Sequence, residues 1–347
     1  MIRNAPFDLP PRPFVRQLRG ARPHIPTARA QPMRGFEDGF TDIVDYIVRI
    51  TDEIWADRGV GRIYDTYAQD CVIYSAGPTV RGVDTVVANT VMGINSAPDG
   101  YTRHLNVAWS GDQSAGFYTS HLGFARSTNT GLSAYGPATG KRIGRYFVAD
   151  CISTDNKIHT EWLMRDNSAM VRQMGLDLHA VARQLAEAPG PSVPVDETGS
   201  ERARHEGPTD TPERWAQHHF DEVWNKRRFD HVAQHYTRDA VAHWCGGREA
   251  RGRRPIQELV VGLLASLPDG EVRIGHVCWS EEGDGVLLAV RWELAGTTRP
   301  GGMLGDVPPG RPLTILASTH LRFVGGYVVE EWTVFDEVAA LVQAYRA

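Results

Sequence analysis

Two aspartates of this chain have types and positions that suit proton-transfer chemistry. Asp166 and Asp336 each end a mostly apolar alternating run, four residues after a tryptophan. An aspartate that faces an apolar pocket is desolvated, so its pKa rises and it can exchange a proton near neutral pH. Helix-like segments follow both aspartates, so an alternative role is to cap the next helix.

A histidine is the natural assistant for such an aspartate. His121 lies within 115–126, a long predicted strand, and a histidine near a carboxylate is the usual proton shuttle. The alternative is a histidine whose hydrogen bonds are satisfied in a half-exposed sheet. We predict Asp166 and His121 as catalytic residues. The residues predicted to contact substrate are Trp109, Tyr118, Tyr146, Asp150, Trp162 and Asn167.

The aspartates belong to an internal repeat. Glu161-Trp162 and Glu331-Trp332 introduce them, and the aspartates lie 170 positions apart. Six matched points at offsets of 169 to 170 indicate a duplicated domain. The second-domain counterparts predicted from this offset are Asp336, Arg291 (in place of His121), His320 (in place of Asp150) and Trp332. Because Arg291 replaces His121, we expect one active and one diverged pocket.

Length and composition fit two domains of ordinary size. The 347 residues are 41% hydrophobic with a net charge of −5, which gives no bulk signal for nucleic acid or a membrane. No apolar run approaches a membrane span, and the first residues do not resemble a secretory signal. The four cysteines lack metal-type spacing and do not match between repeats, which favours reduced thiols in a cytoplasmic protein.

Each repeat reads as helices followed by long strands. Apolar residues spaced three and four apart from Phe40 to Ile54 predict an amphipathic helix. Further predicted elements of the first repeat are a short helix at 63–67, strands at 71–75 and 104–109, a helix at 84–95, and strands at 115–126, 142–153 and 157–166. Those of the second are helices at 212–225 and 254–266, and strands at 240–244, 286–296, 312–323 and 327–336. Segregated helices and strands predict an α+β fold with a mostly antiparallel sheet.

Composition also sets the predicted boundaries. Prolines and arginines dominate the beginning of the chain, and the segment between the repeats holds Pro, Gly, Ser and charge with almost nothing to bury. The predicted organisation is a tail (1–37), domain 1 (38–187), a linker (188–211) and domain 2 (212–347). The tail is expected to be flexible or to wrap the surface, and the sharper alternative is a basic arm that reaches a partner subunit or an anionic ligand.

Both repeats resemble the SnoaL-like polyketide cyclase family, of the nuclear transport factor 2-like superfamily. The residues that carry the resemblance are the run from Gly136 to Lys141, the run from Asp155 to Ile158 leading into Glu161-Trp162, and Asp166-Asn167 followed by the run from Val171 to Gly175. The second repeat keeps Glu331-Trp332 and Asp336. The resemblance implies two tandem cone-shaped domains, each with helices packed on a curved sheet.

The resemblance also implies chemistry without a metal or cofactor. Asp166 would abstract an acidic α-proton of a small apolar carbonyl compound, and His121 would stabilise or protonate the enolate oxygen. A cyclase, isomerase or lyase is therefore expected. The alternatives are a non-catalytic binding or scaffold protein and a lactone or epoxide hydrolase. The expected partners are a small apolar organic ligand and, within the chain, an internal pseudo-dimer, with a homodimer left open. His231 and His235 have no evident third ligand, so no metal site is predicted.

Overall fold

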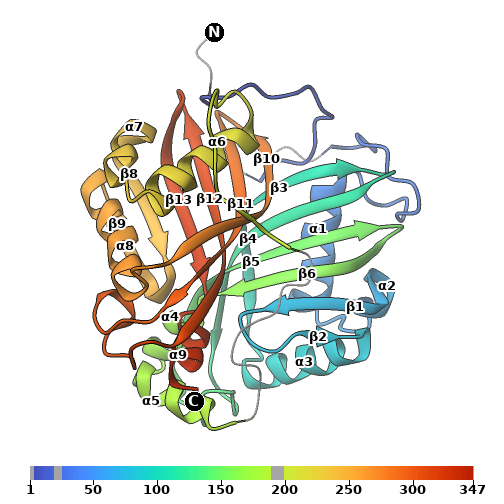
Figure 1. Cartoon of the computed structure of the whole chain (residues 1–347). Coiled ribbons are helices and arrows are strands. Elements are labelled where there is room, and N and C mark those ends of the chain that lie inside the picture. Colours follow the sequence, from blue (N-terminus) through green and yellow to red (C-terminus); the bar gives the residue numbers. More distant parts are fainter. Residues whose placement is uncertain (1–3, 19–25, 189–198, 347) are drawn as a thin grey trace.

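One continuous curved sheet runs through the molecule (Figure 1). The computed structural model describes residues 4–18, 26–188 and 199–346. The strands follow the order β2-β1-β6-β5-β4-β3-β10-β11-β12-β13-β8-β9, and β7 pairs with β10 outside this path. The pairs β1–β6 and β13–β8 are parallel and the others are antiparallel. The predicted α+β class with a mostly antiparallel sheet is confirmed.

The first half of this sheet forms cone 1, which we define as residues 43–165. Its strands are β1 (Tyr67–Ser75), β2 (Val80–Arg81), β3 (Tyr101–Asp112), β4 (Gly116–Thr128), β5 (Arg142–Thr154) and β6 (Lys157–Arg165). Its helices are α1 (Ile43–Thr51), the π-helical turn η1 (Asp52–Ala56), α2 (Arg62–Thr66) and α3 (Val83–Ser96). Two helices follow the cone, α4 (Asn167–Gln173) and α5 (Leu178–Ala186).

The second half forms cone 2, residues 212–335. Its strands are β8 (Tyr236–Trp244), β9 (Arg248–Arg251), β10 (Glu271–Glu282), β11 (Gly285–Thr297), β12 (Pro312–Val324) and β13 (Tyr327–Phe335), with β7 (Glu201–Arg202) before them. Its helical segments are α6 (Pro212–Phe220), η2 (Asp221–Asn225), η3 (Phe229–His231), α7 (Val232–His235), η4 (Cys245–Gly247), α8 (Arg253–Ser266) and η5 (Gly302–Leu304), followed by α9 (Glu337–Tyr345). The two halves share one strand order and a π-helical turn at the same place.

Each cone has an inner face, covered by its own helices, and an outer face. On the inner face of cone 1, Val107 and Cys151 pack with Ile43 and Ile47 of α1 in one apolar cluster. The outer faces of the two cones pack against each other, and the second cluster between them contains Tyr118, Leu122, Trp162, Met164, Cys278, Ala289, Leu316, Trp332 and Val334. The internal contact thus resembles a dimer interface made within one chain.

A β-bulge overturns the predicted alternation on the last strand of each cone. The row Ile158, Thr160, Trp162, Met164 and Asp166 was expected on one side, with Val328 to Asp336 as its copy. The register shifts between Ser153↔Ile158 and Ile152↔Thr160, so one extra residue reverses the faces there. Ile158 therefore packs in the inner cluster and Trp162 in the outer one. A bulge at the same place separates Val328 from Trp332.

Part of the N-terminal arm, residues 4–18, joins the two cones. β3 meets β10 at the single pair Trp109↔Trp279, and the guanidinium of Arg12 lies over both rings, 4.1 and 3.4 Å from their centroids. Arg12 donates hydrogen bonds to the carbonyl oxygens of both tryptophans. Phe7 packs on Trp215 in cone 2, whereas Val15 belongs to the core of cone 1. This part of the arm wraps the surface and spans the seam.

Some predicted segments lie partly outside the described residues. These are 1–3 and 19–25 of the predicted tail and 189–198 of the predicted linker. The boundaries drawn at 37, 187 and 211 remain predictions. In the part of the chain that is described, no helix is long and apolar enough to cross a membrane.

Candidate functional site

Three polar side chains form a hydrogen-bonded chain on the inner face of cone 1. Oδ1 of Asp52 lies 2.9 Å from Nε2 of His104, and Nδ1 of His104 lies 2.9 Å from Nε2 of His121. The two imidazoles are stacked, with centroids 5.0 Å apart. Asp52 is half-exposed and His121 is only 1% exposed, so the chain leads from solvent to the buried floor of the cone.

Irregular backbone places these residues. Asp52 begins the π-helical turn η1 that continues α1, and such turns occur frequently at functional sites. His104 precedes a bulge in β3, where the register shifts between His104↔Gly123 and Asn106↔Leu122. The bulge turns His104 to the face that also carries His121, which is how bulges commonly re-aim side chains beside active sites.

Burial and hydrogen bonding determine the protonation of this relay. Burial, with smaller contributions from the charges of His104 and His320, lowers the pKa of His121 well below its ordinary value, so the ring is neutral at pH 7. In the tautomer in which Nε2–H of His104 donates a hydrogen bond to Asp52, Nδ1 of His104 accepts the hydrogen bond from Nε2–H of His121. His121 then keeps a lone pair on Nδ1. The arrangement gives a neutral base supported by a carboxylate through a second histidine.

The floor beside His121 is apolar and open to solvent. The ring of Phe147 lies edge-on to His121, with centroids 5.5 Å apart. Gly123 faces Phe147 across the strand pair, and a Cβ at this glycine would overlap that ring. Ala149 and Leu163 pack on the inner core of cone 1 but remain partly exposed. Solvent therefore reaches the middle of this floor.

The same register positions in cone 2 are filled with apolar side chains. The hairpin between β10 and β11 closes at Glu282↔Gly285, one residue shorter than Asp112↔Gly116 in cone 1. His104, His121, Gly123 and Phe147 therefore correspond to Ile274, Val290, Trp292 and Ala317, of which Val290, Trp292 and Ala317 are completely buried. The pair Trp292↔Ala317 in cone 2 thus takes the place of Gly123↔Phe147 in cone 1.

This register corrects one predicted counterpart. Arg291 was expected to replace His121. The one-residue difference instead makes Val290 the counterpart of His121, and Arg291 the counterpart of Leu122. Since a shift of one residue changes the face of the sheet, Arg291 lies on the outer face. Its guanidinium lies 3.9 Å from the ring centroid of Trp162. The predicted match of His320 to Asp150 agrees with the register, because Ala289↔His320 corresponds to Ser120↔Asp150.

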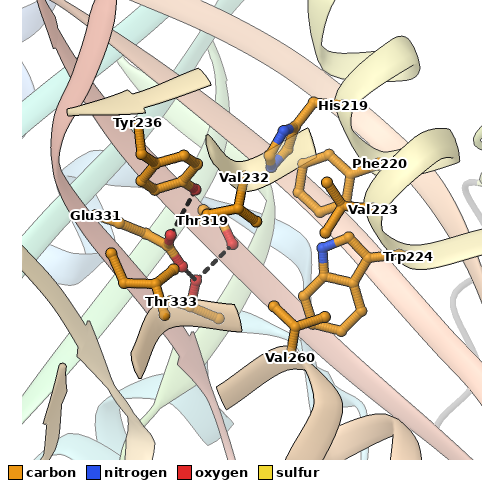
Figure 2. Close-up of a pocket in the computed structure, with 11 residues that line it drawn as sticks. His219, Phe220, Val223, Trp224, Val232, Tyr236, Val260, Thr319, Glu331 and Thr333 are labelled. Carbon is orange, nitrogen blue, oxygen red and sulfur yellow. Dashed lines mark hydrogen bonds between the residues drawn. The ribbon is translucent and has the colours of Figure 1, made fainter. Parts of the chain in front are cut away.

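Cone 2 retains a cavity among buried residues (Figure 2). It is lined by His219, Phe220, Val223, Trp224, Val232, Tyr236, Ile256, Val260, Thr319, Glu331 and Thr333. Glu331 accepts hydrogen bonds from Tyr236 (2.6 Å), Trp244 (2.7 Å) and Thr333 (2.7 Å), which ties the carboxylate into the wall. In cone 1, Glu161 likewise accepts from Tyr67 (3.0 Å), and burial raises its pKa. The glutamate of each Glu-Trp pair thus faces inward and the tryptophan outward.

The structure places Asp166 at the contact between the cones and does not bring it to His121. Asp166 caps α4 and accepts from Ala169 N (3.0 Å), Ser168 Oγ (2.9 Å) and, from cone 2, Gly246 N (2.7 Å). Burial raises its pKa, as predicted, but its oxygens are occupied by donors. No hydrogen bond joins it to His121 in the described residues. The expected Asp166–His121 pair is therefore not formed in this structure.

Asp336 occupies the corresponding position after β13. It caps α9 by accepting from Ala339 N (3.1 Å), and Asn167 donates to its other oxygen. Burial is the main reason that its pKa is raised to about 6. Both aspartates thus follow the capping alternative, and Asn167 connects them across the interface.

A buried polar network on the outer faces gathers most of the other predicted residues. Asp150 accepts from Tyr118 (2.5 Å) and Ser120, and Ser120 also lies 2.9 Å from Nε2 of His320. Nε of Arg291 donates to the Tyr118 oxygen at 3.3 Å. Burial raises the pKa of Asp150 to about 6. These groups join the two cones and do not line the inner floor.

The remaining predicted residues also lie away from His121. Trp162 and Trp332 are buried in the outer-face cluster. Tyr146 packs against that cluster, with its ring 5.8 Å from that of His243. Trp109 is on the inner face, at the seam below Arg12. Of the predicted site, the floor of cone 1 therefore contains His121, and Trp109 at its edge.

Several residues of this site were missed. His104 begins the strand predicted at 104–109, and Asp52 lies within the amphipathic helix predicted from Phe40 to Ile54, but neither was predicted as a site residue. The sequence signal was that His104 has no histidine at the matching place, since Ile274 stands there. Their contact depends on a bulge and a π-helical turn, which a regular periodicity does not reveal. In the described ranges, no group of three or more His, Cys, Asp or Glu side chains has a metal-binding arrangement.

Comparison with known proteins supports the resemblance. Residues 215–344 match the family model for the SnoaL-like polyketide cyclase. A SnoaL-like polyketide cyclase from Agrobacterium tumefaciens is 20% identical over 37% of this chain and 94% of its own, with a TM-score of 0.31. TsrD from Streptomyces laurentii is 14% identical over 39% of this chain and 97% of its own (TM-score 0.34). A phenazine biosynthesis-related protein from Pseudomonas aeruginosa is 15% identical over 39% and 85% (TM-score 0.31). No curated protein matches the chain.

Proposed function

We propose that cone 1 is a cofactor-free acid–base site of the cyclase or isomerase type, acting on an apolar carbonyl compound. The observation that carries the proposal is the Asp52–His104–His121 relay on an open apolar floor. The match of cone 2 to a polyketide cyclase family supports the reaction class. Cone 2 retains a cavity but has Ile274 and Val290 at the positions of the two histidines, so it serves as a support for cone 1.

The proposed chemistry needs one proton to leave and return. With Phe147 turned away from the imidazole, the substrate lies over Ala149 and Leu163, and Nδ1 of His121 takes a proton from the carbon next to the carbonyl group. The C–H electron pair forms an enolate, which attacks a second carbonyl carbon of the same molecule and closes a ring. The new alkoxide then recovers the proton from His121. Asp52, acting through His104, stabilises the transient imidazolium.

The first test is α-proton exchange on a simple aromatic ketone. The protein is incubated with 2-tetralone in D₂O, and deuterium incorporation is followed by NMR. We expect His121→Gln to slow exchange by about 100-fold or more, the usual loss for a general base. His104→Gln and Asp52→Asn should cost about tenfold, because they act through His121. His159→Gln changes an exposed histidine of the same cone and serves as the control.

The pH dependence adds an independent readout. Because the pKa of His121 lies well below its ordinary value, the acid limb of the rate profile should fall below pH 6.5. His104→Gln should move this limb without abolishing it. Equal exchange rates for wild type and His121→Gln would overturn the assignment of the base.

A second candidate function is binding without catalysis. His121 is 1% exposed, and Phe147 lies against its ring, so a ligand reaches the imidazole only if Phe147 moves. Under this alternative, the protein binds aromatic ketones with the same affinity in wild type and His121→Gln and exchanges no α-protons. The exchange experiment therefore separates the two functions.

A further inference from the structure

Two arginines extend the floor of cone 1 beyond the apolar part. Adjacent rows of the inner face read His121↔Ala149↔Leu163 and Gly123↔Phe147↔Arg165 across strands β4, β5 and β6. Arg165 is therefore on the same face as Leu163 and directly across from Phe147. Arg145 lies on β5 two residues before Phe147, on the same face by strand alternation.

Arg165 is exposed, and among the described residues no carboxylate contacts it directly, although its charge acts on the buried Glu161. In the described residues no hydrogen bond or ion pair joins its guanidinium to another side chain, whereas Arg62, Arg248 and Arg322 each contact a carboxylate. Arg145 donates to Oδ1 of Asn167. Burial, and next the charge of Arg165, lower the pKa of Arg145 to about 10, whereas Asp336 and Asp166 act in the opposite direction. The two guanidinium groups thus lie close enough to repel each other, and Arg165 is the exposed one.

Cone 2 has no such charge. The register places Phe335 at the position of Arg165, and Ile315 at that of Arg145, and both are buried. Charged residues thus occur at this end of the floor in cone 1, and buried apolar ones at the same end in cone 2. Arg145 also supports the interface through Asn167, but no structural contact explains Arg165, because cone 2 completes the same strand with Phe335.

Sheet geometry gives the distance that a ligand must span. Neighbouring strands lie about 4.8 Å apart, so two strand spacings separate the His121 row on β4 from Arg165 on β6 by about 10 Å. A bicyclic aromatic molecule with one acidic substituent has this length. Phe147 and Leu163 lie between the two ends and offer the apolar surface for its rings.

We propose that Arg165, with Arg145 behind it, forms an anion-binding subsite, so that the ligand of cone 1 is an aromatic or polycyclic compound carrying a carboxylate or similar acidic group. This inference rests on the proposed function for the location of the reacting end. The subsite itself is a binding property and does not require catalysis. Guanidinium is suited to it because its planar donors match a carboxylate.

The test compares two probes that differ only in charge. Binding of 2-naphthoate and of its neutral amide, 2-naphthamide, is measured by calorimetry with the full chain at low salt. We expect the carboxylate to bind about fivefold more tightly, which corresponds to the roughly 1 kcal/mol of a partly exposed ion pair. Arg165→Gln should remove this difference and leave 2-naphthamide binding unchanged. Arg254→Gln, at an exposed arginine of α8, is the matched control and should preserve the difference.

The outcomes separate this inference from the proposed function. His121→Gln should retain the preference for 2-naphthoate even if it abolishes α-proton exchange. Equal affinity for the two probes, a preference that survives Arg165→Gln, or no binding of 2-naphthoate at its solubility limit would each overturn the subsite. A preserved preference together with unchanged exchange in His121→Gln would instead overturn only the assignment of the base.

Discussion

The two cones share one strand order but use their inner floors differently. Cone 1 places His104 and His121 beside Gly123 and Phe147, whereas cone 2 places Ile274 and Val290 beside Trp292 and Ala317. The outer faces, by contrast, hold equivalent tryptophans and capping aspartates in both halves. The tryptophans and capping aspartates therefore serve the docking of the two cones, whereas the residues of the inner floor differ between them.

The largest expected effect comes from opening the filled cone. Trp292→Ala removes a fully buried indole and its hydrogen bond to Thr319, and should destabilise the chain by about 3–5 kcal/mol. Urea unfolding measures this loss, and added indole should restore part of it by filling the cavity. The hydrogen bonds of the relay in cone 1 should persist, so α-proton exchange by the folded variant should stay at the wild-type rate. A loss below about 1 kcal/mol would show that the floor of cone 2 is not closely packed.

Asp150, which lies at the contact between the cones where cone 2 has His320, should make the unfolding free energy depend on pH. The pKa of Asp150 is raised from 3.8 to about 6, so the folded chain holds this proton more tightly than the unfolded chain. The resulting stabilisation is complete below about pH 4 and is lost as pH rises through about 6. Relative to Asp150→Asn, wild type should lose about 2–3 kcal/mol of unfolding free energy between pH 4 and 7. Parallel stability curves for the two proteins would contradict this.

Replacing Gly123 and Phe147 with the residues of cone 2 should close the floor of cone 1. Gly123→Trp with Phe147→Ala copies the Trp292/Ala317 pair, and should weaken 2-naphthoate binding by about tenfold or more while the chain remains folded. Gly123→Trp alone overpacks the floor against Phe147 and should cost about 1–3 kcal/mol. Calorimetry and urea unfolding of wild type and the two variants test the comparison. Unchanged binding of 2-naphthoate by the double variant would show that another surface binds the ligand.

The smallest effect distinguishes the two capping aspartates. Asp166 accepts from two residues of cone 2 in addition to its helix, whereas Asp336 accepts from Ala339 and Asn167. Asp166→Ala should therefore cost about 1–2 kcal/mol, and Asp336→Ala somewhat less. α-Proton exchange should persist in both folded variants. A stable Asp166→Asn variant that loses exchange would restore Asp166 as the catalytic group.

The fold was largely predictable because it depends on regular patterns. The predicted strands at 115–126 and 142–153 correspond to β4 and β5, and the helix at 84–95 corresponds to α3. The repeat was visible because both copies keep the residues that dock the cones. The strands β2 and β9 are short, and β10 was not anticipated.

The site was less predictable because irregular backbone decides which face a residue occupies. A single extra residue before Thr160 placed Trp162 and Asp166 on the outer face, and one residue fewer in a hairpin moved Arg291 away from the position of His121. The raised pKa of Asp166 was anticipated correctly, yet burial at an interface produces it as readily as burial in a pocket. The sequence alone did not distinguish these environments.

The arm that spans the seam has a consequence for synthesis on the ribosome. Phe7 packs against Phe323, and Arg12 against Trp279, so a segment translated early docks on residues that follow it by 316 (323 − 7) and 267 (279 − 12) positions. At 5–20 residues per second, roughly 15–60 s separate the emergence of these partners. During that interval cone 1 can fold and offer Trp109 to Arg12, but Phe7 lacks Phe323 and Arg12 lacks Trp279. The nascent chain therefore exposes an aromatic and basic segment that is buried only when the second cone is complete.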